Sequence, residues 1–164
     1  MAYELQPMLR IRGMREDRAQ TALAGARRAR KQAEMLLEQK QEKRAKFEET
    51  KEERRDGIFN TIMGRSVTLQ DVDEVRTSVS QIDEQSVLLE QDERKAEDNL
   101  KTKEEAVEAA RVVYVTAAKD LAKIEEHRKA WDEEDRKMRE MLADAEMEEF
   151  TGRKLVSDDD DTFD

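Results

Sequence analysis

The side chains that could support catalysis or bind a metal ion are few in this sequence. His127 is the only histidine and there is no cysteine, so neither a two-histidine metal site nor a thiolate zinc site can form. There is no glycine-rich GxxxxGK loop for phosphate and no nucleophile elbow. The run from Asp158 to Asp161 could attract cations, but a flexible acidic tail is the simpler interpretation. We therefore expect no enzyme activity, no catalytic residue, no metal ion and no cofactor.

The apolar residues in the second half of the chain form a much stronger pattern. Ile124, Trp131, Met138 and Ala145 recur every seven residues, and most positions between them are charged. In steps of three and four residues the same phase runs back to Val72, over roughly ten heptads. A seven-residue apolar repeat of this length predicts a helix that pairs with another helix along one narrow seam.

Composition and charge agree with a helical rod. Charged residues make up 44% of the 164 residues and aromatic residues 4%, with five glycines and one proline, which is typical of long helices or a coiled coil. Residues 1–57 hold 15 basic against 11 acidic side chains, whereas residues 58–164 hold 16 against 30. The two halves are therefore weakly complementary, and the net charge of −10 disfavours nucleic acid as a partner.

The sequence also indicates where the protein works. Its apolar runs are all shorter than the roughly 20 residues of a membrane span, so we expect no direct membrane insertion. Residues 1–15 lack the apolar block of a signal peptide, and the absence of cysteine fits a reducing compartment. We expect a cytoplasmic protein.

The sequence predicts an all-α fold: a long antiparallel two-helix coiled-coil hairpin that forms a single domain over residues 1–156. The first helix is expected at about 7–56, with Pro7 in its first turn, and the turn at 57–68. The second and longer helix is expected at about 69–151, between an N-cap at Thr68 and a C-terminal cap at Gly152. Residues 157–164 are expected to form a disordered acidic tail. The expected seam of the first helix is rich in alanine: Ala19, Ala22, Ala26, Ala29, Ala33, Leu36, Lys40, Lys43 and Phe47.

The two predicted helices differ in length, and this difference carries the functional hypothesis. A turn centred near Met63 makes the numbers of facing residues sum to about 126, so Phe47 would lie near Val79. The first helix would then end before Ile124, and the last heptads of the seam would be uncovered. Exposed apolar stripes mark interaction surfaces, so we expect this one to bind another protein. Two alternatives are that Trp131 packs on the N-terminal residues in a shifted register, or that the stripe pairs with a second copy.

Two other segments have more than one interpretation. An apolar cluster at the turn either plugs the end of the hairpin or binds a partner: Ile58, Phe59, Ile62 and Met63. The stretch from Arg10 to Lys31 holds eight basic side chains against two acidic ones. It is a solvated face, a contact for an acidic protein surface, or a nucleic-acid contact. The absence of interleaved aromatic residues argues against the last.

The beginning of the chain resembles a known family. The segment YELQPMLRIRGMREDRA combines a short apolar stretch with a basic block, carried by Leu5, Met8, Leu9, Ile11, Arg12, Arg15, Glu16, Asp17 and Ala19. The last quarter holds a tryptophan in HRKAWDEED. With the predicted hairpin and the absence of cysteine, these features resemble the YscO/FliJ-like family of bacterial type III secretion stalk proteins, and in particular its injectisome branch.

The resemblance implies a fold and a set of partners. Members of this family are antiparallel two-helix coiled coils similar to the central stalk of rotary ATPases. They bind the hexameric export ATPase, contact the export gate protein, and are thought to hand over secretion chaperones at the inner face of the secretion apparatus. By analogy, the end that holds both termini would enter the ATPase ring. In this sequence that end corresponds to Leu5, Leu9, Arg12, Arg15, Ile124, Trp131, Met138 and Leu142.

Three functional hypotheses follow. The first is a cytoplasmic stalk or adaptor that links the export ATPase to the export gate and handles secretion chaperones. The second is a self-associating coiled-coil scaffold without an ATPase partner. The third is a nucleic-acid or membrane-surface binder that works through Arg10–Lys31 and whose binding weakens with salt.

Overall fold

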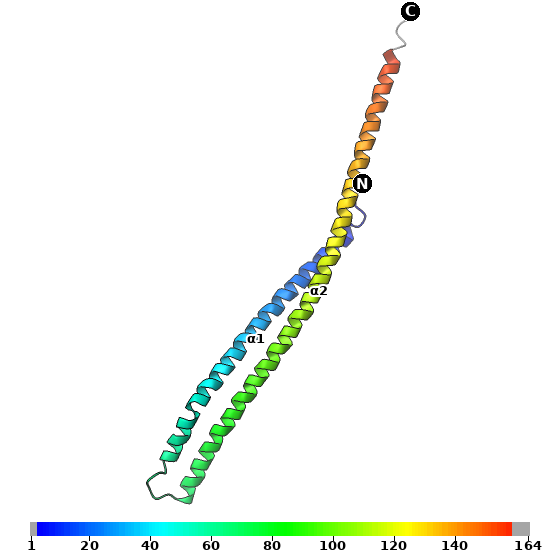
Figure 1. Ribbon diagram of the computed structural model, residues 1–164. Coiled ribbons are helices and arrows are strands. Elements are labelled where there is room, and N and C mark those ends of the chain that lie inside the picture. The colour runs from blue at the N-terminus through cyan, green and yellow to red at the C-terminus, as the bar shows by residue number, and fades with distance from the viewer. Residues whose placement is uncertain (1–2, 159–164) are drawn as a thin grey trace, which may run out of the picture. The chain divides into compact units, whose positions relative to one another are not determined.

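The computed structural model describes residues 3–158 of the chain, and their side chains as far as residue 149. Two helices account for nearly all of it, α1 (Gln6–Asn60) and α2 (Leu69–Asp158), joined by residues 61–68 (Figure 1). The described residues contain no strand. The predicted all-α hairpin with a longer second helix is confirmed.

The chain divides into two compact units, each made of parts of both helices. The hairpin unit is Gln20–Val113, and the terminal unit combines Met1–Ala19 with Tyr114–Asp164. We describe each unit by itself. The expectation of a single domain over residues 1–156 stays a prediction.

The hairpin unit is held together by an apolar seam between α1 and α2. Its centre is a cluster of three buried residues, Phe47, Ile82 and Leu89, against which Ile58 packs. On α2 the predicted heptad phase is confirmed, since no position of the stripe is exposed from Val75 onward within this unit. Burial of such side chains stabilises the pairing by about 1.5–3 kcal/mol each.

The seam of α1 differs from its prediction at every second position. Ala19, Ala33 and Phe47 are buried as expected. Between the shared positions, however, the seam is formed by Leu23, Leu37 and Arg44, and the adjacent Ala22, Leu36 and Lys43 are exposed. The steps alternate four and three residues, not three and four. This phase places Leu23, in place of an alanine, against α2 and brings Arg44 to Glu93, with 2.7 Å between Nη1 and Oε2.

Polar contacts show that the pairing register is also shifted. Lys40, expected opposite residue 86, forms a salt bridge with Asp92 (Nζ–Oδ2 2.7 Å). Nearer the turn, Lys51 approaches Asp83 (3.7 Å), and the Ser86 hydroxyl donates to Glu48 Oε1. The hydrogen bond from Lys40 Nζ, with its positive charge, lowers the pKa of Asp92 below the ordinary value. The predicted register was therefore wrong. The extension of α1 past Gly57 to Asn60 moves the centre of the turn in the direction of this shift.

The boundary between turn and second helix follows the prediction. The Asp71 backbone N–H donates to Thr68 Oγ1 (3.2 Å), and the Thr68 backbone N–H donates to Asp71 Oδ2 (2.8 Å). This is a capping box, so Thr68 is confirmed as the N-cap of α2. Gly64, in the turn, has a φ of 75°, a left-handed conformation that glycine adopts without steric cost.

The end of α2 differs from its prediction. Gly152 lies inside the helix, which continues to Asp158, so the expected C-terminal cap at this glycine was wrong. One glycine costs a helix about 1 kcal/mol relative to alanine, which is not enough to end it. Ser157 and Asp158, expected in the disordered tail, are the last residues of α2. The rest of that predicted tail, residues 159–164, lies outside the described residues.

Candidate functional site

The N-terminal residues of the terminal unit pack on α2 at Trp131. The Tyr3 ring lies 5.5 Å from the Trp131 ring and 5.8 Å from the His127 ring, measured between centroids. The Tyr3 hydroxyl is 2.9 Å from His127 Nδ1 and donates to it when the imidazole carries its proton on Nε2. Trp131 is therefore half-buried by its own chain. The expectation that this residue is uncovered was wrong, and the alternative of a shifted register is the arrangement found.

Four more of the expected partner-binding residues belong to the seam within the chain. Ile124 is 5% exposed, and Leu5 and Leu9 are half-buried. Arg12 is also half-buried and donates from Nη1 to the backbone carbonyl of Asp120 (2.7 Å). The predicted uncovered stripe beginning at Ile124 was therefore wrong, because the register shift extends the cover that α1 gives to α2.

The uncovered part of α2 begins beyond Trp131. Figure 1 shows α2 continuing beyond the start of α1, with no part of α1 beside it. Its apolar residues in the phase of the seam are all exposed, and so is the adjacent Met141. We call these four residues the overhang stripe: Met138, Met141, Leu142 and Ala145. Met138 is 51% exposed and Leu142 is 58% exposed. These two expected site residues are therefore free of cover from the described chain.

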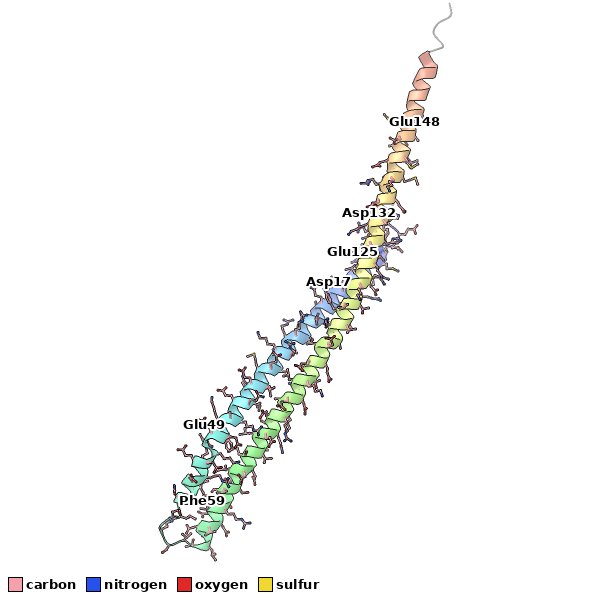
Figure 2. The ribbon with its side chains drawn as sticks, in the orientation of Figure 1. Asp17, Glu49, Phe59, Glu125, Asp132 and Glu148 are labelled. Atoms are coloured by element: carbon pink, nitrogen blue, oxygen red, sulfur yellow. The ribbon has the colours of Figure 1, made fainter. Side chains whose placement is uncertain are left out.

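Acidic side chains surround the overhang stripe. Residues 132–149 hold nine acidic residues and three basic ones. Arg139 contacts Asp135, and Arg136 Nε lies 3.8 Å from Glu140 Oε1, so these two arginines are paired within the helix. Figure 2 shows Asp132 and Glu148 on this part of α2. A partner of the stripe must therefore offer apolar contacts with a positively charged rim.

A second uncovered apolar face lies at the start of α1 and was not found by the sequence analysis. Pro7, Ile11 and Met14 are spaced four and three residues apart, which places them on one face, away from the seam. Ile11 is 51% exposed, and shallow hollows lie on both sides of it. We call the following exposed residues the α1 outer stripe: Pro7, Met8, Arg10, Ile11, Met14, Arg15 and Arg18. The expected site residue Arg15 belongs to this stripe.

The turn residues divide between packing and exposure. Ile58 packs on the core cluster and Ile62 is half-buried, so these two close the end of the seam. Phe59 is 43% exposed and Met63 is 72% exposed (Figure 2 labels Phe59). Only these two residues of the expected tip cluster are open to a partner.

The remaining side chains give no sign of another kind of site. Within the described part of the chain, no group of three or more histidine, aspartate or glutamate side chains is arranged to hold a metal ion. His127 is exposed and contacts Tyr3. None of the described helices is both long and apolar enough to span a membrane. Uncovered helix faces are thus the main surfaces available for function.

Comparisons with known proteins agree with this geometry. The model of the family described as type III secretion protein YscO matches residues 5–153. The solved structure of a YscO homologue from Chlamydia trachomatis is similar over 99% of both chains, with a TM-score of 0.72 and 20% sequence identity. At this identity the similarity concerns the fold. No protein with a curated functional description matches the sequence.

Proposed function

Because the chain belongs to the YscO family of type III secretion proteins, and is therefore a component of a type III secretion system, we propose that it is a cytoplasmic stalk or adaptor that binds the hexameric export ATPase. The observation that carries the proposal is the uncovered overhang stripe in the unit that contains both helix ends. A stalk needs such an end, since its contacts with a ring must come from exposed side chains.

The structure revises the roles that we assign to the expected site residues. Arg15, Met138 and Leu142 are exposed, so we assign them direct contacts with the ATPase. The other expected site residues are covered within the chain: Leu5, Leu9, Arg12, Ile124 and Trp131. They hold α1 and α2 in register, so that the uncovered part of α2 begins at a defined residue.

The turn of the hairpin unit supports a second contact in this proposal. Phe59 and Met63 are exposed at the turn, and their apolar side chains suit a site for the export gate protein. Secretion chaperones would be handled by the same adaptor while it is bound to the ATPase. These partners come from the family resemblance, and the exposed tip is the feature of this chain that suits them.

A binding experiment with the purified export ATPase tests the main proposal. The variant Met138→Glu/Leu142→Glu places two charges in the overhang stripe, and we expect it to lose ATPase binding in a pull-down. The matched control is Val87→Glu/Leu88→Glu, two residues of the hairpin unit that are 51% and 61% exposed. The control should bind normally. If the overhang variant binds as well as the unchanged protein, the overhang is not the ATPase site.

The same experiment separates the rival function. A scaffold without an ATPase partner predicts no binding of the export ATPase by the unchanged protein under conditions in which the chain is folded and self-associated. Helical content measured by circular dichroism establishes that each variant is folded.

A further inference from the structure

The terminal unit contains two uncovered stripes of opposite charge. Residues 6–18 of α1 hold four basic and two acidic side chains, whereas residues 132–149 of α2 hold nine acidic and three basic ones. Each stripe has an apolar centre, Ile11 and Met14 in one and Met138 and Leu142 in the other. Each therefore has the apolar and electrostatic character that the other requires in a partner.

The apolar parts of the two stripes also match in length. Pro7 to Met14 and Met138 to Ala145 each cover eight residues, which is about 10 Å or two helical turns. Two helix faces of equal length can pack along their whole apolar centre without leaving part of either uncovered. The overhang stripe cannot reach the α1 outer stripe of its own chain, because α2 continues as one helix beyond the start of α1 (Figure 1).

The positions of the two stripes along α2 are compatible with a twofold-symmetric dimer. Tyr3 lies beside Trp131, and Arg12 lies beside Asp120, so residues 7–18 of α1 run alongside about residues 115–126 of α2. The overhang stripe begins seven residues after Trp131. A twofold axis near Trp131 would set residues 138–145 of one copy against residues 117–124 of the other. In that second copy, the α1 outer stripe lies beside these residues of α2.

We propose that two copies of the chain associate about such an axis, with the overhang stripe of each copy packed on the α1 outer stripe of the other. Ile11 and Met14 of one copy contact Met138, Met141 and Leu142 of the second. Arg15 and Arg18 lie near Asp144 and Glu146 of the second copy. In a twofold pair each contact is made twice, so a modest interface is doubled.

The pairing has a consequence that rests on the proposed function. It covers Arg15, Met138 and Leu142, the residues assigned to the ATPase contact. Self-association and ATPase binding therefore exclude each other, and the free protein is held in a form whose binding end is masked. Adding the export ATPase to the paired chain should convert it to single copies bound to the ATPase.

Sedimentation equilibrium of the full chain tests the pairing without the ATPase. We expect a dimer at concentrations of about 10–100 μM, and Ile11→Glu should weaken the association by at least about tenfold. The matched control is Met35→Glu, in the hairpin unit, because Met35 is 53% exposed on the same helix. The control should associate as the unchanged protein does. Circular dichroism should show that both variants keep the helical content of the unchanged protein.

A charge exchange identifies the surfaces in contact. The variants Arg15→Glu/Arg18→Glu and Asp144→Arg/Glu146→Arg should each fail to form dimers with themselves, since both copies of the contact become repulsive. Mixed in equal amounts, the two variants should form a heterodimer. One of its two contacts then has the original charges on both sides. In the other contact the charges of both stripes are reversed, so that the stripes still attract each other. The control Arg76→Glu, a reversal in the hairpin unit, should leave dimer formation unchanged.

Several outcomes would overturn the pairing. A monomer throughout the range to about 100 μM contradicts it. So does a dimer that Ile11→Glu does not weaken, or a failure of the two charge variants to combine. Binding of the monomer to anionic phospholipid vesicles through Arg10, Arg15 and Arg18 would assign the α1 outer stripe to a membrane surface instead. None of these results depends on whether the export ATPase binds.

Discussion

At the scale of single residues, Tyr3 decides where the uncovered part of α2 begins. Its ring packs against Trp131 and His127, so the uncovered stripe begins after Trp131 and not at Ile124. Heptad spacing could not have revealed this contact, because Tyr3 precedes α1 and belongs to no helical repeat. The sequence shows that Trp131 and Met138 belong to the same seven-residue repeat. It does not show that Trp131 is covered by its own chain and that Met138 is exposed.

Removal of the Tyr3 ring should expose Trp131. We expect Tyr3→Ala to shift the fluorescence of this single tryptophan to longer wavelength and to increase its quenching by acrylamide. Loss of the aromatic contact should lower the free energy of unfolding by about 1 kcal/mol. Tyr3→Phe, which keeps the ring and loses only the hydroxyl, should retain the emission of the unchanged protein. An unchanged spectrum in Tyr3→Ala would show that Tyr3 does not cover Trp131 in solution.

At the scale of elements, the two helices were not equally predictable. Most neighbours of the α2 stripe are polar or charged, so its phase was clear from the sequence and holds from Val75 to Ile124. On α1, Leu36 and Leu37 are adjacent and chemically equivalent, so spacing alone could not choose between them. The choice is made by contacts across the seam, such as that of Arg44 with Glu93, which no single helix contains.

The capping box of α2 gives a pH-dependent prediction. Hydrogen bonds from the Thr68 backbone N–H, and then from its hydroxyl, lower the pKa of Asp71 below its ordinary value. A carboxylate with a lowered pKa stabilises the fold above its ordinary pKa, and this contribution is lost as the pH falls through the lowered pKa. Thr68→Ala should therefore reduce stability at neutral pH, by about 1 kcal/mol for the lost cap.

Urea unfolding followed by circular dichroism measures this effect. The difference in the free energy of unfolding between Thr68→Ala and the unchanged protein should be largest at neutral pH. It should become smaller in acid, once Asp71 is protonated. Thr77→Ala is the matched control, since the Thr77 hydroxyl only donates to the Asp73 carbonyl within α2. A difference that is as large in acid as at neutral pH would contradict the assigned role of the Asp71 carboxylate.

At the scale of the whole molecule, apolar side chains are buried in some places and exposed in others. They form the seam between α1 and α2, and they remain exposed in the overhang stripe and the α1 outer stripe. The hairpin and the existence of an overhang were predictable from the long heptad repeat. The α1 outer stripe was not predicted, because Ile11 and Met14 lie in a segment that is basic and that carries the family pattern. Neither property indicates a second apolar face of the helix.

The exposed residues of the turn and of the overhang stripe predict separable binding functions. Met63→Asp changes the tip, where the side chain is 72% exposed, and should weaken binding to the export gate protein while leaving ATPase binding intact. Met138→Glu/Leu142→Glu should have the opposite effects. Pull-downs of both partners with both variants provide the measurement. If one variant removes both partners while its helical content is unchanged, the turn and the overhang stripe do not act separately.

Site-specific photocrosslinking tests most directly the claim that the overhang stripe is the ATPase contact. A photoreactive side chain at position 138, incubated with the hexameric export ATPase, should crosslink to the ATPase. The same group at position 88, which is exposed in the hairpin unit, should not. Crosslinks to the ATPase from position 88 but not from position 138 would contradict the account.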